Sequence, residues 1–193
     1  MARIREFDTE AAVDAAMNAF RRKGYEGTSV QDLVDATGVG RGSLYAAFGS
    51  KEGLYLAALD RYRLMYATPL VDILRCGAPA RELLREVLVG VVDEVVRDGS
   101  RRACLIVGAS AERVAHDPKV AAHLRATASS LEDALCEVVA EAQAQGQLGS
   151  ARDARDVARF LLSVMQGLRV MGSINPDRRA LMASAEVALD SLG

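Results

Sequence analysis

The chain has 193 residues, of which half are apolar and only 5% are aromatic, and it has no tryptophan. This size allows one large or two small domains that fold without disulfides, and three widely spaced cysteines without a C-x-x-C pattern argue against a disulfide framework or a zinc site. A net charge of −2 excludes a strongly basic protein, so any contact with DNA must depend on where individual charges lie.

The composition favours helices. Alanine, leucine, arginine, glutamate and valine dominate, and we expect an all-α fold with about nine helices. The start of the chain, M-A-R-I-R-E-F-D-T-E, is too charged for a signal peptide, and no apolar run reaches transmembrane length. We therefore expect a cytoplasmic protein.

The first helix is expected to begin after a short polar arm. The arm, Met1 to Phe7, contains two arginines, and we interpret it as a frayed end rather than as an arm for the minor groove of DNA. Asp8 can cap the helix, which should end near Lys23. The basic run R-R-K at its end suits the negative end of the helix dipole, and contact with phosphate is the alternative.

A second, short helix is expected to begin at Thr28. Thr28 and Gln31 have the spacing of a capping box, in which each side chain bonds the other residue's backbone amide. Val30, Leu33 and Val34 form one apolar stripe. Gly38 then supplies a residue that tolerates a positive φ, so the helix should end there.

A third helix should open at about Arg41, after only two further residues. Leu44 and Phe48 stand four apart and should face inward, against the second helix. The outer face and leading end then carry Arg41, Gly42, Ser43 and Tyr45. An arginine, a hydroxyl and a phenol beside a glycine that permits close approach suit a helix that reads base edges in the major groove.

The fourth helix should begin with Ser50 as its cap and Lys51 in its first turn. Free backbone amides and the ammonium group then point the same way, which favours a phosphate at this helix end. No acidic residue occurs between Ala36 and Ser50, so Arg41 and Lys51 have no local counter-charge. The helix continues toward Pro69 and would connect the first helices to the rest of the chain.

Two runs in this region resemble the helix-turn-helix of the TetR family of transcriptional regulators. They are R-R-K-G-Y-E-G-T-S-V, from Arg21 to Val30, and V-G-R-G-S-L-Y-A-A-F-G-S-K-E, from Val39 to Glu52. The resemblance implies a three-helix DNA-binding domain at residues 1–52 and a larger helical domain for effector binding and dimerisation at residues 53–193. It also implies a double-stranded, palindromic DNA operator, a small-molecule effector, and a repressor that functions as a homodimer.

The resemblance assigns roles to individual residues of the helix-turn-helix. Those expected to hold phosphates are Thr28, Ser29, Tyr45 and Lys51. Those expected to face bases are Arg41, Gly42 and Ser43.

The helices after Pro69 are expected to be longer. Pro79 suits the first turn of a strongly apolar, central helix, and a further helix should run from about Arg102 to His116. Asp117 and Pro118 read as the cap and first turn of a long helix that reaches about Gln145.

The last two helices have the most regular apolar spacing in the chain. In the TetR family they form a four-helix dimer interface, and the resemblance implies the same here. The residues expected in it are Phe160, Leu161, Val164, Leu168, Leu181, Ala185 and Leu189. The alternative is that these faces cover the chain's own core. Gly167 would let another backbone come close.

A largely apolar effector pocket is expected among the helices of the larger domain. Its candidate liners are Tyr62, Met65, Val91, Cys104, Ile106, Leu135 and Met165. Each of these side chains is more often an ordinary core residue than a ligand contact.

Cys104 is the most distinctive of these residues. It follows Arg101 and Arg102 and should lie just inside a helix start, where charge and amide dipoles favour a thiolate. The run R-x-C-L-I-V is similar to a TetR subgroup in which a cysteine responds to electrophiles or oxidants, although that subgroup commonly has glycine where this chain has Ala103. An electrophile or redox sensor is therefore an alternative function. A buried, inert cysteine is the other interpretation.

No set of residues typical of an enzyme is visible in the sequence. His116 and His123 are seven positions apart, about 10 Å along one helix, which is too far to bind one metal together. The glycines of V-G-R-G-S do not follow a strand and do not form a dinucleotide fingerprint. We expect no catalytic residues, metal or cofactor. An enzyme or a plain helical interaction module is the remaining alternative.

Overall fold

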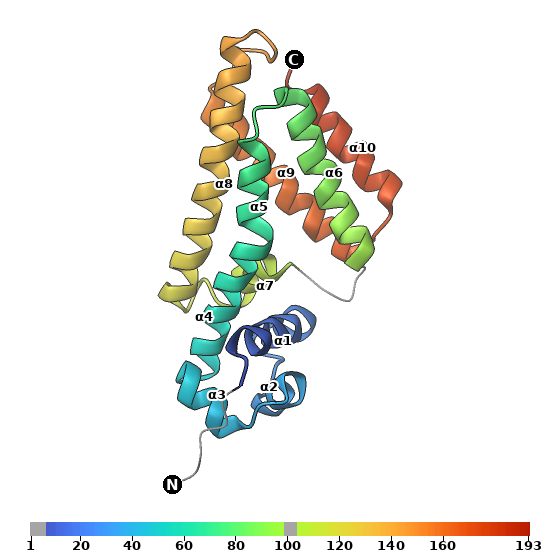
Figure 1. Ribbon diagram of the computed structural model, residues 1–193. Helices are drawn as coiled ribbons and strands as arrows, with labels where there is room; N and C mark the ends of the chain where they lie inside the picture. The colour runs from blue at the N-terminus through green and yellow to red at the C-terminus, as the bar shows by residue number, and fades with distance from the viewer. Residues whose placement is uncertain (1–6, 99–103) are drawn as a thin grey trace. The chain divides into compact units, whose positions relative to one another are not determined.

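A computed structural model describes residues 7–98 and 104–193, and within these ranges every regular element is a helix (Figure 1). The elements are α1 (Thr9–Lys23), α2 (Val30–Thr37), α3 (Arg41–Phe48), α4 (Lys51–Tyr62), the π-helical segment η1 (Arg63–Ala67), α5 (Thr68–Leu74), α6 (Ala80–Asp98), α7 (Leu105–Glu112), α8 (Pro118–Ala144), α9 (Ala154–Ile174) and α10 (Arg178–Asp190). Because α4, η1 and α5 follow one another without a break, the described residues form nine continuous helices. The all-α prediction is confirmed. The N-terminal arm with Arg3 and Arg5 lies outside the described residues.

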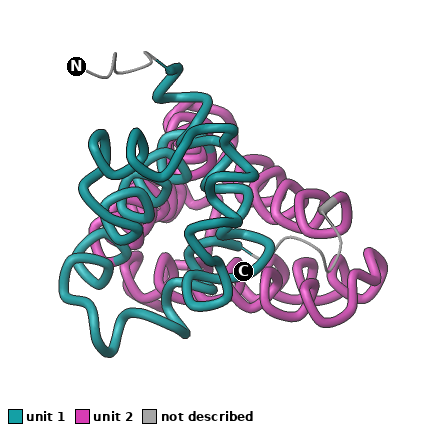
Figure 2. The backbone as a smooth tube through the Cα atoms, turned by 90° about the horizontal axis from the view of Figure 1, so that it is seen from below, with its two compact units in different colours: residues 1–65, 104–124 teal, residues 66–103, 125–193 magenta. Residues whose placement is uncertain are grey.

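The chain divides into two compact units (Figure 2). The first contains residues 1–65 and 104–124, and the second contains residues 66–103 and 125–193. This division differs from the expected boundary between residues 52 and 53. The reason is that α4 packs on α1, and that α7 returns to contact α1 and α4.

The first unit is built on α1, which contacts α2, α4 and α7. Asp8 caps it as predicted, since its carboxylate accepts the backbone N–H of Ala11 at 3.0 Å. At the far end of α1, Phe20 meets the ring of Tyr55 edge-on, with 4.8 Å between ring centroids, and Tyr25 lies equally close to Tyr55. This aromatic cluster gives a small unit a large buried area.

The second helix begins two residues later than predicted. Its capping box joins Ser29 to Asp32: the Ser29 hydroxyl oxygen accepts the N–H of Asp32 at 3.1 Å, and the Asp32 carboxylate accepts the N–H of Ser29 at 2.8 Å. Thr28 instead donates its hydroxyl to the Gly24 carbonyl at 2.6 Å. The predicted end is confirmed, because Gly38 has φ 68° and its N–H bonds the carbonyl of Val34.

The second unit has an aliphatic core formed mainly by α6, α8, α9 and α10 (Figure 1). Helix α6 packs against both α9 and α10, as its apolar character predicted. Helices α6 and α9 pack closely at Gly172, where a Cβ atom would clash with the Val95 side chain. Within this chain, Gly172 rather than Gly167 is therefore the glycine that permits close packing of a neighbouring helix. Gly167 is exposed.

The helices that flank residues 113–117 differ in how well their bounds were predicted. Helix α7 is shorter than expected because the chain forms turns after Glu112. Asp117 caps α8 as predicted, since its carboxylate accepts the N–H groups of Lys119 at 3.0 Å and Val120 at 3.1 Å.

Helix α9 departs from the expectation that no apolar segment of the chain is long enough to span a membrane. By length and composition alone it would be able to cross a membrane, although buried helices of other proteins pass the same test. Its buried residues are Val157, Ala158, Leu161, Met165, Leu168 and Gly172. Large apolar side chains on another face of α9 are exposed. The helix is therefore rich in apolar residues because two of its faces, one buried and one exposed, are apolar.

Candidate nucleic-acid interface

The third helix has the bounds and the inner face that the sequence predicted. Leu44 is 1% exposed and anchors α3, which contacts α2 and α4. Phe48 is only half-buried. No side chain caps the first amides of α3, because its N-cap is Gly40, and the helix contains no acidic residue. The start of α3 therefore carries an uncompensated positive dipole end.

The outward residues of α3 are accessible. Arg41 and Gly42 are exposed, and Ser43 and Tyr45 are partly exposed. The Arg41 guanidinium lies 5.3 Å from the centroid of the Tyr45 ring, so a cation and a phenol share this face. Both side chains offer hydrogen-bond donors, which phosphates and base edges accept.

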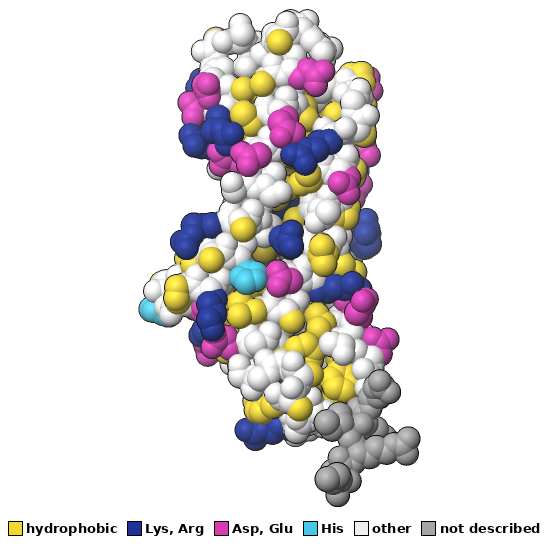
Figure 3. Space-filling view, turned by 60° about the vertical axis from the view of Figure 1, so that its left-hand side comes forward, with side chains coloured by type: hydrophobic (Ala, Val, Ile, Leu, Met, Phe, Trp, Pro, Cys, Tyr) yellow, Lys and Arg dark blue, Asp and Glu magenta, His cyan; other side chains and the backbone are white. Residues whose placement is uncertain are grey.

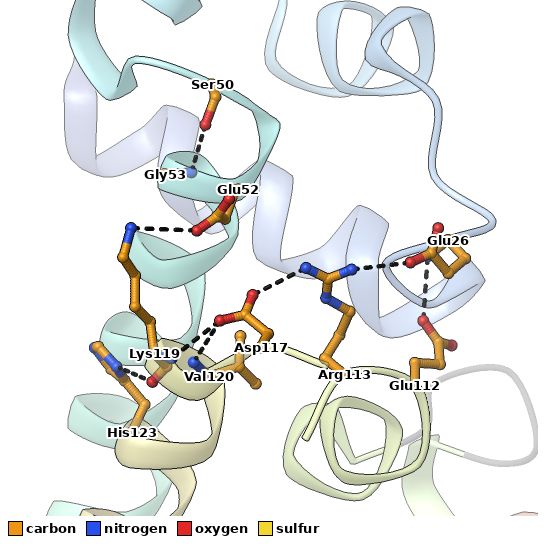
Figure 4. Close-up of polar contacts among 10 residues, drawn as sticks. All are labelled: Glu26, Ser50, Glu52, Gly53, Glu112, Arg113, Asp117, Lys119, Val120 and His123. Carbon is orange, nitrogen blue, oxygen red and sulfur yellow. Dashed lines mark hydrogen bonds and ion pairs between the residues drawn. The ribbon is translucent and has the colours of Figure 1, made fainter. Parts of the chain in front are cut away.

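Lys51 lies at the start of α4. Ser50 caps this helix as predicted, because its hydroxyl oxygen accepts the N–H of Gly53 at 3.1 Å (Figure 4). The Lys51 ammonium lies 4.2 Å from the centroid of the Tyr25 ring, a cation–π distance. A cation held beside free helix amides is suited to a phosphate.

Two of the predicted phosphate contacts are altered by local hydrogen bonds. Thr28 is fully buried, with its hydroxyl bonded to Gly24, so the expectation that its side chain holds a phosphate is wrong. Ser29 is exposed, but its hydroxyl donates to the Asp32 carboxylate at 2.7 Å.

The basic run at the end of α1 has mainly structural contacts. Arg21 is 4% exposed and stacks over Tyr62, with its guanidinium carbon 5.6 Å from the ring centroid. Lys23 forms an ion pair with Asp32, and this bond, together with that from Ser29, holds the pKa of the Asp32 carboxyl well below its ordinary value. Of the three cations, Arg22 and Lys23 are exposed.

On the face drawn in Figure 3, cations do not form one large patch. Figure 3 shows basic and acidic side chains interspersed over the face in view. The net charge of −2 leads to the same expectation as before, that any contact with DNA depends on the local placement of cations such as Arg41 and Lys51.

Sequence reasoning missed a group of charged residues that contact this region from the end of α7 and the start of α8 (Figure 4). Glu112 and Arg113 contact the turn between α1 and α2, and Lys119 lies 3.4 Å from the Glu52 carboxylate. These pairs are far apart in sequence and have no local spacing that would reveal them.

The predicted pocket residues fall into two separate sets. In the first unit, Tyr62 is buried and donates its hydroxyl to the Cys104 sulfur at 3.3 Å. Ile106 is partly buried, but Met65 is exposed. In the second unit, those that pack within the solid core are Val91, Leu135 and Met165. The chain therefore does not bring the seven residues together as one pocket lining within either unit.

Two cavities in the second unit have other linings. One, of about 360 Å³, lies among residues 74–83 and 137–147, and one of about 430 Å³ lies among residues 149–160 and 191–193. None of the predicted liners borders either cavity.

Cys104 is the N-cap of α7 rather than a residue inside the helix. It is partly exposed and free of any disulfide. The neighbouring Arg101 and Arg102, whose charge the prediction used, lie outside the described residues.

The expected dimer residues are largely core residues of the chain itself. Five of the seven are buried in the second unit, namely Leu161, Leu168, Leu181, Ala185 and Leu189. These five residues cannot form the expected interface, because their side chains are buried within the chain itself. The apolar spacing of α9 and α10 instead reflects the packing of both helices on α6. Phe160 is exposed and Val164 partly exposed.

The described residues contain no group of three or more histidines, cysteines and acidic residues placed to hold a metal ion. His123 has other contacts. Its Nδ1 lies 3.0 Å from the carbonyl oxygen of Lys119, and its Nε2 lies 3.3 Å from the Asp60 carboxylate. His116 is exposed.

Comparison with known proteins identifies both parts of the chain. Residues 12–58 match the family "Bacterial regulatory proteins, tetR family", and residues 80–187 match the family "Tetracyclin repressor-like, C-terminal domain". The HTH-type transcriptional regulator YezE of Bacillus subtilis is 32% identical over the full length of both chains. The HTH-type transcriptional repressor ComR of Escherichia coli is 30% identical, over 97% of this chain and 90% of ComR.

The fold agrees with these relatives. A solved structure of the TetR family regulator CifR, a cysteine variant in complex with a 26-base-pair operator DNA, is 34% identical. It superposes with a TM-score of 0.87 over 99% of this chain and 100% of that chain. These are proteins that regulate transcription, not enzymes. The chain, with its exposed α3 and its two matching parts, belongs to the TetR family of DNA-binding transcriptional regulators.

Proposed function

We propose that the protein is a cytoplasmic, ligand-responsive transcriptional repressor that binds a palindromic operator as a homodimer. The observation that carries this proposal is the outward face of α3, where exposed Arg41 and Gly42 lie beside an uncapped helix start without any acidic residue. Two relatives, ComR and BdcR of Escherichia coli, bear the name of transcriptional repressors, and CifR has been solved with operator DNA.

The proposed reading mode follows from the chemistry of that face. Helix α3 enters the major groove with Arg41, Gly42 and Ser43 toward the base edges. A guanidinium bonded to both acceptors of one guanine contributes about 1–3 kcal/mol of discrimination against other bases. The phosphate contacts come from Tyr45, Lys51 and the exposed Ser29, without the side chain of Thr28.

A second copy of the chain is the proposed partner of α9 and α10. Exposed apolar side chains on these helices support this proposal. On α9, the stripe consists of Phe160, Val164, Gly167, Met171 and Ile174, with Ile174 70% exposed. On α10, it consists of Ala180, Ala183 and Val187, with Val187 71% exposed. Removing such a surface from water favours association.

A small molecule is proposed to release the repressor from DNA. Such a ligand shifts the equilibrium only if it binds the DNA-free conformation more tightly than the bound one. The two cavities of the second unit are of the size of ligand sites, which run from about 300 to 1,000 Å³ in other proteins.

The test of this function is selection of bound fragments from the source genome, followed by measurement of affinity on the selected sequence. We expect a palindromic site, and we expect Arg41→Ala to weaken binding about 5- to 150-fold for each half-site that the dimer contacts and to relax preference at one position of each half-site. Absence of any retained DNA at low salt would refute the proposal and favour a helical interaction module.

A second candidate function is a thiol sensor of the same architecture. It is supported by the contact of the Tyr62 hydroxyl with the Cys104 sulfur at 3.3 Å, since a modified sulfur would no longer fit this buried phenol in the same way. Replacing Cys104 with serine separates the candidates. If an alkylating agent releases the operator from the wild type and from Cys104→Ser equally, the thiol mechanism is wrong.

A further inference from the structure

The end of α7 contacts the turn between α1 and α2 through one carboxylate (Figure 4). Glu112 accepts the backbone N–H groups of Tyr25 at 2.7 Å and of Glu26 at 3.1 Å. These amides follow the end of α1 and precede α2. A carboxylate bonded to two amides is a strong, directional attachment.

Gly24 makes room for this attachment. A Cβ atom at position 24 would lie 2.0 Å from one carboxylate oxygen of Glu112, and the residue has φ +72°. Any other residue would therefore be strained and would also displace the carboxylate. The turn and the end of α7 fit together only through this glycine.

Arg113 adds a second attachment to the same turn. Its guanidinium bonds the Glu26 carboxylate at 3.1 Å and the Asp117 carboxylate at 2.9 Å (Figure 4). It also lies 4.3 Å from the centroid of the Tyr25 ring. Through Asp117, which caps α8, the turn is joined to the start of that helix as well.

The Tyr25 ring connects these residues to the DNA-binding face. The Lys51 ammonium lies 4.2 Å from its centroid, so one ring contacts both Arg113 and Lys51. Burial raises the pKa of the Tyr25 hydroxyl, and the neutral ring remains available to both cations. A shift of the turn would therefore move the surface on which Lys51 rests.

We propose that Glu112 and Arg113 are positioning residues for DNA binding, which hold the Gly24–Gly27 turn and thereby fix Lys51 for a backbone phosphate. Helix α7 is then the element that reports to the DNA-binding helices, because its first turn adjoins the Cys104–Tyr62 contact and its last residue holds the turn. This inference rests on the proposed function, since it needs an operator to act on.

The experiment compares Glu112→Ala with Asp93→Ala, which removes a partly exposed carboxylate paired with Arg178 in the second unit. Binding to a fluorescent, selected operator is measured by anisotropy over a series of salt concentrations. We expect Glu112→Ala to bind at least about tenfold more weakly and its log–log salt slope to fall by about 2, because one phosphate contact is lost in each subunit of the dimer. Asp93→Ala should bind within about twofold of the wild type.

A positioning role differs from a merely structural one in the salt slope. Loss of folded protein would lower the active fraction but leave the slope of the remaining molecules unchanged. An unchanged slope for Glu112→Ala, with or without a loss of affinity, would overturn the proposal.

A double-mutant cycle tests whether Glu112 acts through Lys51. If it does, Glu112→Ala in a Lys51→Met background should cost less than threefold in affinity, because the contact that it positions is already absent. Fully additive losses would contradict the proposal.

Hydrogen exchange provides a readout that needs no DNA. The amides of Tyr25 and Glu26 should exchange slowly in the wild type and at least about tenfold faster in Glu112→Ala, while the amides of α6 keep their wild-type rates. Unchanged exchange would refute the contact. If Glu112→Ala does not fold, Glu112→Gln keeps the length and one acceptor oxygen, and we expect a smaller change in the same direction.

Measurements on the wild type distinguish a failure of the proposed DNA-binding function from a failure of the positioning role of Glu112. A wild type that binds no DNA fragment refutes the proposed function, and the exchange rates of the two amides still decide whether Glu112 holds the turn. A wild type that binds DNA as tightly and with the same salt slope as Glu112→Ala refutes the positioning role alone.

Discussion

The two compact units are stabilised by different kinds of interaction. In the first, short helices are joined by an aromatic cluster and by charged pairs such as Arg113 with Glu26, which bring together segments that are far apart in the sequence. In the second, long helices share an aliphatic core, and many ion pairs, such as Arg85 with Glu186, lie on its exposed rim. Directional polar bonds therefore lie next to the DNA-binding helices, and the second unit depends mainly on apolar burial.

The largest expected effect is in the aliphatic core. Leu135 on α8 is fully buried, so Leu135→Ala should lower the free energy of unfolding by about 2–5 kcal/mol through lost burial and a residual cavity. Urea denaturation followed by circular dichroism measures it. Leu64→Ala is the control, because Leu64 is 52% exposed and should change stability by less than about 0.5 kcal/mol. Equal effects of the two substitutions would contradict a core dominated by Leu135 and its neighbours.

A smaller effect is expected at the charged cluster of the first unit. Arg113→Met keeps an unbranched, flexible stem but leaves Asp117 without its guanidinium partner, and the free energy of unfolding should fall by about 1–3 kcal/mol. Thermal unfolding at neutral pH measures the loss. Arg113→Lys should recover only part of it, because an ammonium does not present the planar fork that reaches Glu26 and Asp117 together. Full recovery by lysine would show that charge alone is sufficient.

The acid sensitivity of the first unit should depend on Asp117. Burial opposes its ionisation, but hydrogen bonds from Val120, Arg113 and Lys119 prevail and hold its pKa below the ordinary value. A lowered folded-state pKa contributes stability that is present above the unfolded pKa, about 3.9, and that is lost as the pH falls through the folded pKa.

We therefore expect the free energy of unfolding to fall below about pH 4, and Asp117→Asn to remove part of this fall. At neutral pH, Asp117→Asn should lower the free energy of unfolding by about 1–3 kcal/mol, the same range as for Arg113→Met. The loss should not be larger, since asparagine keeps an acceptor for the α8 amides. Denaturation at pH 7 and pH 3 measures both. Asp72→Asn, at an exposed position of α5, is the control; an equal change in acid sensitivity there would contradict the assignment.

The smallest effect is expected on the rim of the second unit. Arg85 and Glu186 lie 2.6 Å apart, but both side chains are more than one-third exposed. Exposed pairs contribute about 0–1 kcal/mol, so Arg85→Ala should change the thermal midpoint little. If Arg85→Ala destabilised the protein as much as Arg113→Met, the charged pairs of the two units would not differ in their contribution to stability.

Elements with local signals were predictable from the sequence. The bounds of α3, the left-handed Gly38 and the caps Asp8, Ser50 and Asp117 were all expected, because each depends on residues within four positions. The start of α2 was missed because both Thr28 and Ser29 can cap a helix. Asp32 decided between them, since its carboxylate bonds Ser29 and also pairs with Lys23.

Interactions between distant segments were not predictable. Glu112 bonds an amide 87 positions away, and no periodicity or motif records such a pair. The dimer residues were misassigned for a related reason. The spacing of Leu161 and Leu168 shows that one face of α9 is covered, but it does not tell whether the chain itself or another chain covers it. The predicted base and phosphate contacts of Arg41 and Lys51 stay predictions.

The two apolar faces of α9 have a consequence for stability measurements. In an isolated chain, water contacts the face that carries Phe160 and Ile174. If a second copy covers this face, as proposed, it binds only the folded protein, and by mass action it raises the melting temperature as the protein becomes more concentrated. The melting temperature should therefore rise across a dilution series from low to high concentration, even in the absence of DNA and effector.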